Sequence, residues 1–311
     1  MRRMYYPLQQ MGSSMQIPDA VILCDVGPRD GFQYEDTRIP TDLKVQIIRG
    51  LAEAGLPRIQ VASFVHPQWV PQMADAEDVV AQLPEADGVR YSGLALNLRG
   101  VERANAAGLK AIDLSIATWD EHSLDNANMS VDEAVVQAIT MVERALAFGM
   151  EVQIGVQTAF GFKSPGDTPM VRVLEIVGRF VKMGVESISL ADTTGMANPM
   201  MIAERVDMVR DITADIPLVL HLHDTRGLGM VNVYEAIRHG IDRFDTSLAA
   251  MGGCPFIQGA AGNIATEDTA YLLETLGIST GVDIERVAAC SRRIAEFLGK
   301  SFPGRLYRIA R

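Results

Sequence analysis

Cysteine is scarce in this sequence: Cys24, Cys254 and Cys290 are the three thiols in a chain of 311 residues. An odd, sparse set of cysteines does not suit a disulfide-stapled secreted domain, so we expect a reducing, cytoplasmic location. No window approaches 18 uncharged apolar residues, which excludes a transmembrane helix. The 28 basic residues face 39 acidic ones, and with a net charge of −11 we expect neither a nucleic-acid nor a membrane partner.

Aromatic residues and phosphate-binding glycine signatures are also lacking. Aromatic residues make up 6% of the chain, so aliphatic side chains must fill its interior. No G-x-G-x-x-G motif follows the first β-rich run, which argues against an open, doubly wound dinucleotide-binding sheet. What is present is a chain that is 48% apolar and has the length of one large α/β barrel.

Short runs rich in β-branched and aliphatic residues recur about every 25–40 residues, which is typical of repeated βα units. Amphipathic stretches with helical periodicity lie between them. This alternation predicts an α/β fold, a (β/α)8 TIM barrel with an extra C-terminal helix. The expected strands are 21–26, 58–63, 91–96, 111–116, 152–157, 187–192, 218–223 and 243–248.

The same pattern divides the chain into three parts. We expect an N-terminal extension at 1–19, the catalytic barrel at 20–282, and a C-terminal helix with a tail at 283–311 packed on the barrel. Two helix starts are marked by polar residues. Thr41 is expected to cap a helix over 41–54. Ser130 and Glu133 have the spacing of a capping box at the start of a helix over 130–148.

A barrel places its active site at the C-terminal ends of the strands. His221 and His223 in "HLH" are two residues apart in an expected strand, so their side chains project from the same face. That pattern alone leaves two alternatives, a divalent-metal site or one barrel-filling and one capping histidine. Asp30 above the first strand favours the metal, because two histidines and a carboxylate form a facial ligand set. With Asn263 as a further oxygen ligand, Mg²⁺ or Mn²⁺ is expected over Zn²⁺.

Further candidates lie in the same loops, and each has a structural alternative. Arg29 is either the salt-bridge partner of Asp30 or a fixed cation for a developing oxyanion. Cys254 is either a small packing residue or a thiol that the glycine-rich loop presents to the site. Asp192 ends the sixth expected strand, and Gln33 follows the first; both are predicted to bind substrate.

Five stretches together resemble one known family. They are "DVGPRDGFQ", "ASFVHPQWVPQMAD", "SLADTTG", "HLHDTRG" and "GGCPFIQGAAGNIATED", and the likeness runs in matching order from about residue 20 to 299. They are similar to the 3-hydroxy-3-methylglutaryl-CoA lyase family of divalent-metal TIM-barrel lyases. The resemblance implies a metal held by Asp30, His221, His223 and Asn263, with Asp30 and His221 also counted among the catalytic residues. It also implies that Arg29 polarises the enolate oxygen and that Cys254 acts as an acid/base.

The chain departs from the family pattern at three places. Gln60 stands where the family usually has a glutamate, so a hydrogen-bonding side chain is kept and its charge is lost. The loops that meet CoA in the family usually carry lysine, whereas this chain has Asp36, Gln68 and "EHSLDNAN". Phe256 and its neighbours make the glycine-rich loop more apolar. These departures alter the predicted substrate-binding surroundings and leave the metal set intact.

We therefore expect a metal-dependent carbon–carbon lyase that cleaves a 3-hydroxy-3-methylglutaryl-CoA-like substrate by retro-Claisen or retro-aldol chemistry. The partner is a small hydroxy acid or an acyl-CoA, and the assembly is a homodimer or a higher homo-oligomer. Three alternatives remain: a lyase for a related 3-hydroxy acid without CoA, a Claisen-type synthase, and a catalytically silent barrel. The synthase usually needs an added C-terminal region, for which a chain ending at Arg311 leaves no room.

Overall fold

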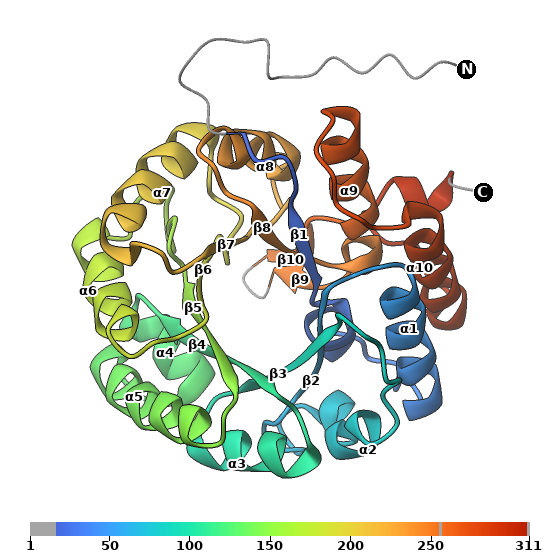
Figure 1. The fold of residues 1–311 in the computed structure, drawn as a ribbon, viewed down its shortest axis with the longest axis horizontal. Helices are drawn as coiled ribbons and strands as arrows, with labels where there is room; N and C mark the ends of the chain where they lie inside the picture. Colours follow the sequence, from blue (N-terminus) through green and yellow to red (C-terminus); the bar gives the residue numbers. More distant parts are fainter. Residues whose placement is uncertain (1–16, 255–256, 310–311) are drawn as a thin grey trace.

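Eight parallel strands close into a barrel in this computed structural model, which describes residues 17–254 and 257–309 (Figure 1). The side chains of 126 and 254–261 lie outside that description. Each strand pairs with the next one in sequence, and the last strand pairs with the first. The strands are β1 (Ile22–Asp25), β2 (Arg58–Ser63), β3 (Arg90–Ala95), β4 (Ala111–Ala117), β5 (Glu151–Gln157), β6 (Ser187–Ala191), β7 (Leu218–His221) and β8 (Arg243–Thr246). The predicted (β/α)8 TIM barrel is confirmed.

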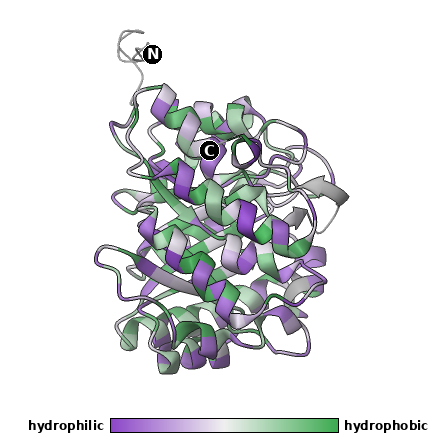
Figure 2. Cartoon of the chain, turned by 90° about the vertical axis from the view of Figure 1, so that its right-hand side faces the viewer, coloured by the Kyte–Doolittle hydropathy of each residue, from purple (hydrophilic) through white to green (hydrophobic). Residues whose placement is uncertain are grey.

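The helices surround the barrel and bury their apolar faces against it. They alternate hydrophilic and hydrophobic residues, as amphipathic helices do (Figure 2). Valine, isoleucine and leucine dominate the core between the helices and the strands. The helices are α1 (Thr41–Glu53), α2 (Ala76–Val80), α3 (Leu98–Ala107), α4 (Asp120–Ala127), α5 (Val131–Ala147), α6 (Met170–Val181), α7 (Pro199–Thr213), α8 (Gly229–Arg238), α9 (Thr266–Thr275) and α10 (Ile284–Leu298).

Four short helical turns and one hairpin complete the described part of the chain. A π-helical turn, η2 (Gly27–Gly31), follows β1, and a hairpin of β9 (Gly253–Cys254) and β10 (Ile257–Ala261) follows β8. The other turns are η3 (Pro71–Met73), η4 (Leu248–Ala250) and η5 (Leu306–Arg308). The turn η2 and the hairpin both belong to the loops at the C-terminal ends of their strands, where a barrel builds its site.

The two predicted helix starts have different outcomes. The capping box at the start of α5 is confirmed, because Ser130 and Glu133 each accept the other's backbone N–H. The prediction that Thr41 caps α1 is wrong. Pro40 occupies the capping position, and the Thr41 hydroxyl donates instead to the Asp75 carboxylate at 2.7 Å. A charged acceptor makes the stronger hydrogen bond.

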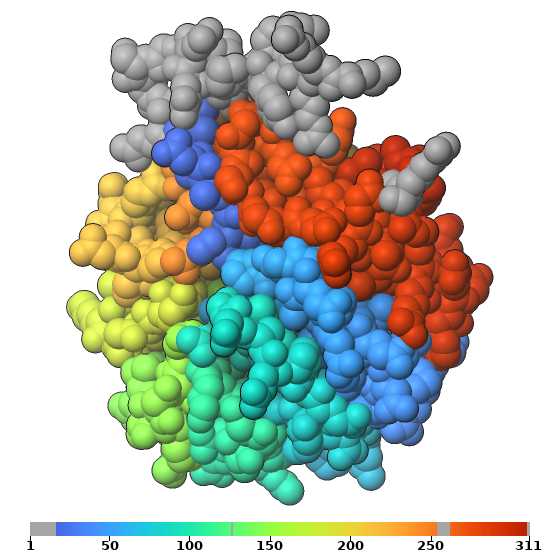
Figure 3. Space-filling view, turned by 45° about the vertical axis from the view of Figure 1, so that its right-hand side comes forward, coloured from blue at the N-terminus to red at the C-terminus, as the bar shows by residue number. Residues whose placement is uncertain are grey.

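The C-terminal helices lie beside the start of the barrel. The helix α10 packs against α1, and the backbone N–H of Asp283 donates to the carbonyl of Ala54 at 2.8 Å (Figures 1 and 3). The proposed division at 19 and 282 stays a prediction, since residues 1–16 lie outside the described part. Among the described residues, no helix combines the length and the apolar character needed to cross a bilayer.

Candidate functional site

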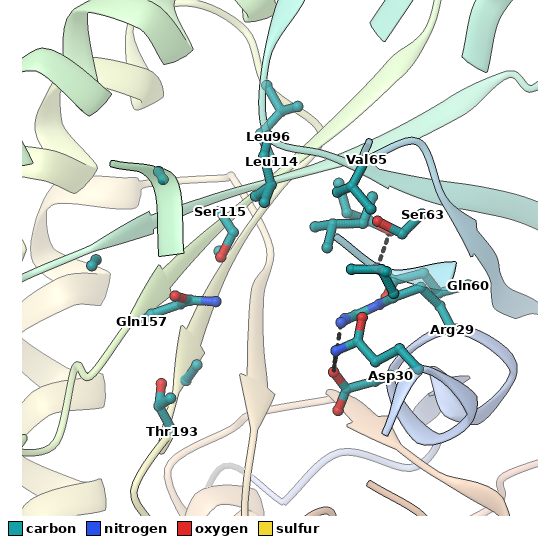
Figure 4. A pocket seen from close by; sticks show the side chains of 18 of the residues that line it. Arg29, Asp30, Gln60, Ser63, Val65, Leu96, Leu114, Ser115, Gln157 and Thr193 are labelled. Atoms are coloured by element: carbon teal, nitrogen blue, oxygen red, sulfur yellow. Dashed lines mark hydrogen bonds and ion pairs between the residues drawn. The ribbon is translucent and has the colours of Figure 1, made fainter. Parts of the chain in front are cut away.

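A cavity of about 1020 Å³ opens among the strand ends and reaches into the barrel. Arg29, Asp30 and Gln60 lie on one wall, and Ser115 and Gln157 face them from the other side (Figure 4). The polar residues of this wall come from the loop after β1 and from inside β2. The cavity is large enough for a substrate of several hundred cubic ångströms.

Asp30, His221 and His223 meet at this cavity. One ligand atom from each lies within 4.8 Å of the others. Asp30 belongs to η2, and π-helical turns often occur at functional sites. His221 is the last residue of β7, whereas His223 lies beyond the strand in an isolated bridge with Asn263. The expectation that both histidines belong to one strand is therefore wrong, although their side chains do come together.

The two imidazoles have Nε2 atoms only 3.2 Å apart. Burial alone would lower the pKa of His221, but the hydrogen bond and charge of Asp245 outweigh burial and raise this pKa above its usual value. Burial, followed by the nearby His221, lowers the pKa of His223 to about 3. His223 is therefore neutral, which is the form that binds metal.

Asp245 on β8 orients the first of these histidines. Its carboxylate lies 3.3 Å from His221 Nδ1. A carboxylate that accepts the Nδ1 proton leaves Nε2 free to bind a metal ion. The sequence alone does not single out Asp245, because an acidic residue within the run "RFDTSL" indicates only a strand position. Asp245 could have been found from the sequence as a charged residue at a strand position that faces into the barrel.

Asn263 joins the glycine-rich loop to the cluster. Its Nδ2 donates to Asp30 Oδ2 at 2.7 Å and to the carbonyl of Met251 at 3.0 Å. Its Oδ1 is buried and has no hydrogen-bond partner. A buried oxygen without a donor is costly in a folded protein, and a cation would satisfy it. The donor set of one carboxylate, two imidazoles and one amide oxygen thus fits a divalent metal ion.

Arg29 is held beside the cluster by two contacts. Its Nη1 lies 2.5 Å from Asp30 Oδ1, and its Nε donates to Gln60 Oε1. Gln33 Nε2 donates to the same Asp30 oxygen at 3.3 Å. Burial opposes ionisation of Asp30, but the charges of Arg29 and His221 lower its pKa below the usual value. The carboxylate is therefore ionised and ready to bind a cation.

Asp192 is placed away from the cavity wall. Its Oδ1 accepts the backbone N–H groups of Met196 and Ala197 at 2.8 and 3.1 Å. It does not contribute to the cavity lining, whereas its neighbour Thr193 does. Burial raises the pKa of Asp192 to about 6. The geometry gives Asp192 a part in shaping the turn that presents Thr193, and its contact with substrate stays a prediction.

The side chain of Cys254 lies outside the described residues. Its backbone pairs with Ile257 in the β9–β10 hairpin, and the preceding Gly253 lines the cavity. The backbone of Gly252 is close to the cluster: a Cβ atom there would lie 2.5 Å from Asn263 Nδ2. The loop that bears Cys254 therefore starts next to the proposed metal ligands.

A strained turn leads into that loop. Ala249 and Ala250 have φ of 54° and 58°, a left-handed conformation that costs energy for any residue with a Cβ atom. The buried carboxyl group of Glu267 accepts the Ala249 N–H at 3.1 Å. From the other side, the N–H of Gly304 donates to the Ala249 carbonyl at 2.9 Å. Both contacts hold the turn in its strained form.

Comparisons with known proteins are consistent with this geometry. The HMGL-like family model matches residues 20–294. The chain belongs to the HMGL-like family. Mitochondrial hydroxymethylglutaryl-CoA lyase of Mus musculus is 37% identical over 287 residues, which is 91% of this chain and 87% of that protein. The cytoplasmic 3-hydroxy-3-methylglutaryl-CoA lyase of Rattus norvegicus is 36% identical over 298 residues, covering 95% of this chain and 86% of the relative.

Solved structures of HMGL-like proteins share the whole barrel. The Bacillus subtilis HMG-CoA lyase has a TM-score of 0.92 and 34% identity, covering 95% of this chain and 99% of that one. An HMG-CoA lyase from Acinetobacter baumannii, in complex with coenzyme A and 3-methylmalate, has a TM-score of 0.89 and 36% identity. That comparison covers 94% of this chain and 96% of the Acinetobacter chain.

The acid that anchors the strained turn predicts a pH dependence of stability. Burial raises the pKa of Glu267 from 4.5 to about 8, so the folded protein binds this proton more tightly than the unfolded chain. Stability from this group is therefore greatest at low pH and falls as pH rises from about 4.5 through 8. We expect Glu267→Gln to flatten the fall of the urea midpoint measured at several pH values across that range. Asp25, whose pKa burial raises to about 7, keeps part of the slope.

Glu285→Gln is the matched control, since Glu285 is exposed on α10. It should leave the pH dependence of the midpoint unchanged. An unaltered slope in Glu267→Gln would contradict the assignment of a bound proton to this carboxyl group.

Proposed function

We propose that this protein is a metal-dependent carbon–carbon lyase that cleaves a 3-hydroxy-3-methylglutaryl-CoA-like substrate. The observation that carries the proposal is the convergence of Asp30, His221 and His223 beside a large cavity at the strand ends. Membership of a family whose similar members are named hydroxymethylglutaryl-CoA lyases supports the reaction class. The Acinetobacter relative, bound to coenzyme A and 3-methylmalate, supports an acyl-CoA substrate.

The proposed metal ligands are Asp30, His221 and His223, with Asn263 Oδ1 as the fourth. Asparagine and carboxylate oxygens favour Mg²⁺ or Mn²⁺. A divalent cation held by these residues would act as a Lewis acid and lower the pKa of the substrate hydroxyl. Asp245 keeps His221 in the tautomer that is protonated at Nδ1. The unprotonated Nε2 then faces the proposed metal ligands.

The chain's own residues then account for the bond cleavage. The substrate hydroxyl gives its proton to a base, a role we assign to the Cys254 thiolate. The oxygen then forms a carbonyl as the adjacent carbon–carbon bond breaks, the bonding electron pair passes to the departing enolate, and Cys254 returns the proton to the enolate carbon. The Arg29 guanidinium, fixed beside Asp30, stabilises the enolate oxygen. We assign protonation of the enolate carbon to Cys254 and substrate binding to Gln33, Gln60 and Asp192. The reaction runs in the retro-Claisen or retro-aldol direction.

A lyase for a related 3-hydroxy acid is the second candidate, and the charges that line the cavity favour it. Asp36, Asp125 and His66 line the cavity, and the lysine and arginine side chains among its described lining residues are Arg29 and Arg38. Coenzyme A carries several phosphate charges, and its sites commonly supply lysine or arginine. Because Arg29 lies beside the proposed metal ligands, the cavity offers little further positive charge to the phosphates of an acyl-CoA.

We further propose a cytoplasmic location and a homodimeric or higher homo-oligomeric assembly. The small number of cysteines supports a reducing compartment. Similar relatives include both a mitochondrial and a cytoplasmic lyase.

Replacing one histidine tests the metal centre. We expect His223→Ala to lose bound Mn²⁺ while the fold is kept, because one of the two imidazole ligands is removed. Metal content after dialysis and the far-UV circular dichroism spectrum would measure the two effects. His239→Ala is the control, since His239 pairs with Asp207 at a more exposed position. Full metal occupancy in His223→Ala would refute the ligand assignment.

Replacing the loop cysteine tests proton transfer. We expect Cys254→Ser to lower turnover by at least about 10²-fold, the usual scale of general acid–base catalysis, with normal metal content. Cys290→Ala, in the distant α10, should keep its turnover. A turnover of Cys254→Ser close to that of the wild type would show that Cys254 transfers no proton and only packs the loop.

A kinetic comparison tests the two substrate classes. We expect kcat/KM for 3-hydroxy-3-methylglutaryl-CoA with Mg²⁺ or Mn²⁺ to lie below about 10⁴ M⁻¹s⁻¹, the low end of ordinary enzymes. The reason is the shortage of cationic side chains along the cavity. Free 3-hydroxy acids and other acyl-CoA thioesters would be assayed beside it. A higher value for this thioester would show that the missing lysines do not limit the enzyme.

A further inference from the structure

Gln60 forms the link between Arg29 and a buried carboxylate on a more distant strand. It lies on β2 and is 4% exposed. Its Oε1 accepts a hydrogen bond from Arg29 Nε, and its Nε2 donates to Asp113 Oδ2 at 2.5 Å. Asp113 lies on β4, is 5% exposed, and lines the cavity as well. The sequence reading assigned no role to Asp113.

The two ends of a glutamine amide are nearly the same shape, so its orientation depends on its neighbours. An ionised carboxylate only accepts hydrogen bonds, so Asp113 can face only the NH₂ end of Gln60. The carbonyl end then points to Arg29. In the flipped orientation, the NH₂ group would face the N–H donors of Arg29, and no hydrogen bond would form between them.

We propose that Asp113 is a positioning residue, which fixes the Gln60 amide so that its oxygen holds the Arg29 guanidinium in place. The negative charge of Asp113 is itself matched, because Arg58 Nη2 lies 2.8 Å from Asp113 Oδ1. Arg58 also pairs with Glu186 at 3.1 Å. The charge of Asp113 is thus balanced by Arg58 at Oδ1, the oxygen that does not meet Gln60.

Arg29 consequently has a neutral partner on β2. Arg29 already has one carboxylate in direct contact, Asp30, at 2.5 Å. A carboxylate at position 60 would add a second, whereas the amide holds the guanidinium without adding negative charge and so favours an anionic oxygen of the substrate there. Its other partner, Asp30, is a proposed metal ligand. This step rests on the proposed function. If it holds, Gln60 and Asp113 together determine specificity. They favour substrates that place a carboxylate or an enolate oxygen at Arg29.

The orientation of the amide can be measured without any substrate. In ¹⁵N-labelled protein, the Gln60 side-chain NH₂ signals, identified by their loss in Gln60→Leu, should be protected from hydrogen exchange. In Asp113→Asn this protection should be lost, because asparagine offers both a donor and an acceptor and no longer dictates one orientation. Equal protection in the two proteins would overturn the proposal, whatever reaction the enzyme catalyses.

A double-mutant cycle tests whether Asp113 acts through Gln60. The Mn²⁺-loaded protein would be titrated with 3-hydroxy-3-methylglutarate, an acid with two carboxylates. Asp113→Asn should weaken binding about tenfold, the scale of one hydrogen bond to a charged group. In the Gln60→Leu background the same change should have almost no effect. An equal loss in both backgrounds would show that Asp113 acts through the fold alone and would overturn the proposal.

Glu186→Gln is the matched control, because it removes another carboxylate from Arg58 without touching Gln60. It should lower the thermal midpoint while the dissociation constant stays unchanged. Asp113→Glu keeps the negative charge and should retain protection of the Gln60 amide. This second variant keeps the test decisive if Asp113→Asn does not fold. If the wild type neither binds nor cleaves any tested hydroxy acid, the proposed function fails, and the exchange measurement still decides the role of Asp113.

Discussion

The hydrogen-bonded pairing of β1 with β8 closes the barrel and brings the two ends of the candidate site together. Residues Ile22 to Asp25 pair in register with Arg243 to Thr246. As a result, η2 after β1 lies against the turn after β8, and Asp30 meets Asn263 across a sequence separation of 233 residues. Without this closure, Asp30 would have no contact with the histidines at the end of β7.

The site is built from pairs in which one buried group orients the other. Asp245 orients His221, Asn263 contacts Asp30, and Asp113 orients Gln60. Each pair satisfies polar atoms that would otherwise be costly inside a barrel. The barrel interior thus differs from one filled only by branched aliphatic side chains. Here part of it serves as a rigid polar support for the groups that face the cavity.

The strands were predictable from sequence because parallel barrel strands are buried on both faces and appear as short apolar runs. Their order and the placement of Asp30 and His221 at strand ends followed from the barrel. The fine geometry did not follow. Thr41 has a carboxylate partner from a distant segment, and His223 lies beyond β7, because both positions depend on tertiary contacts.

Asp113 shows why part of the candidate site was not predictable. Within "AIDLSI" a single acidic residue has no local pattern that indicates its partner. Its role depends on the distances between β2, β3 and β4, since Ser92 on β3 also donates to it at 2.6 Å. A charge at an inward-facing strand position is a usable signal, but only once the barrel is known.

The strained turn at Ala249 couples the C-terminal segment to the loop that carries Cys254. Gly304 approaches so closely that a Cβ atom there would lie 2.8 Å from the carbonyl carbon of Ala249. No larger residue fits without moving the turn. The conformation of the loop that carries Cys254 therefore depends on segments outside the loop. To graft this loop onto another barrel, Glu267 and the segment around Gly304 would have to be grafted together with it.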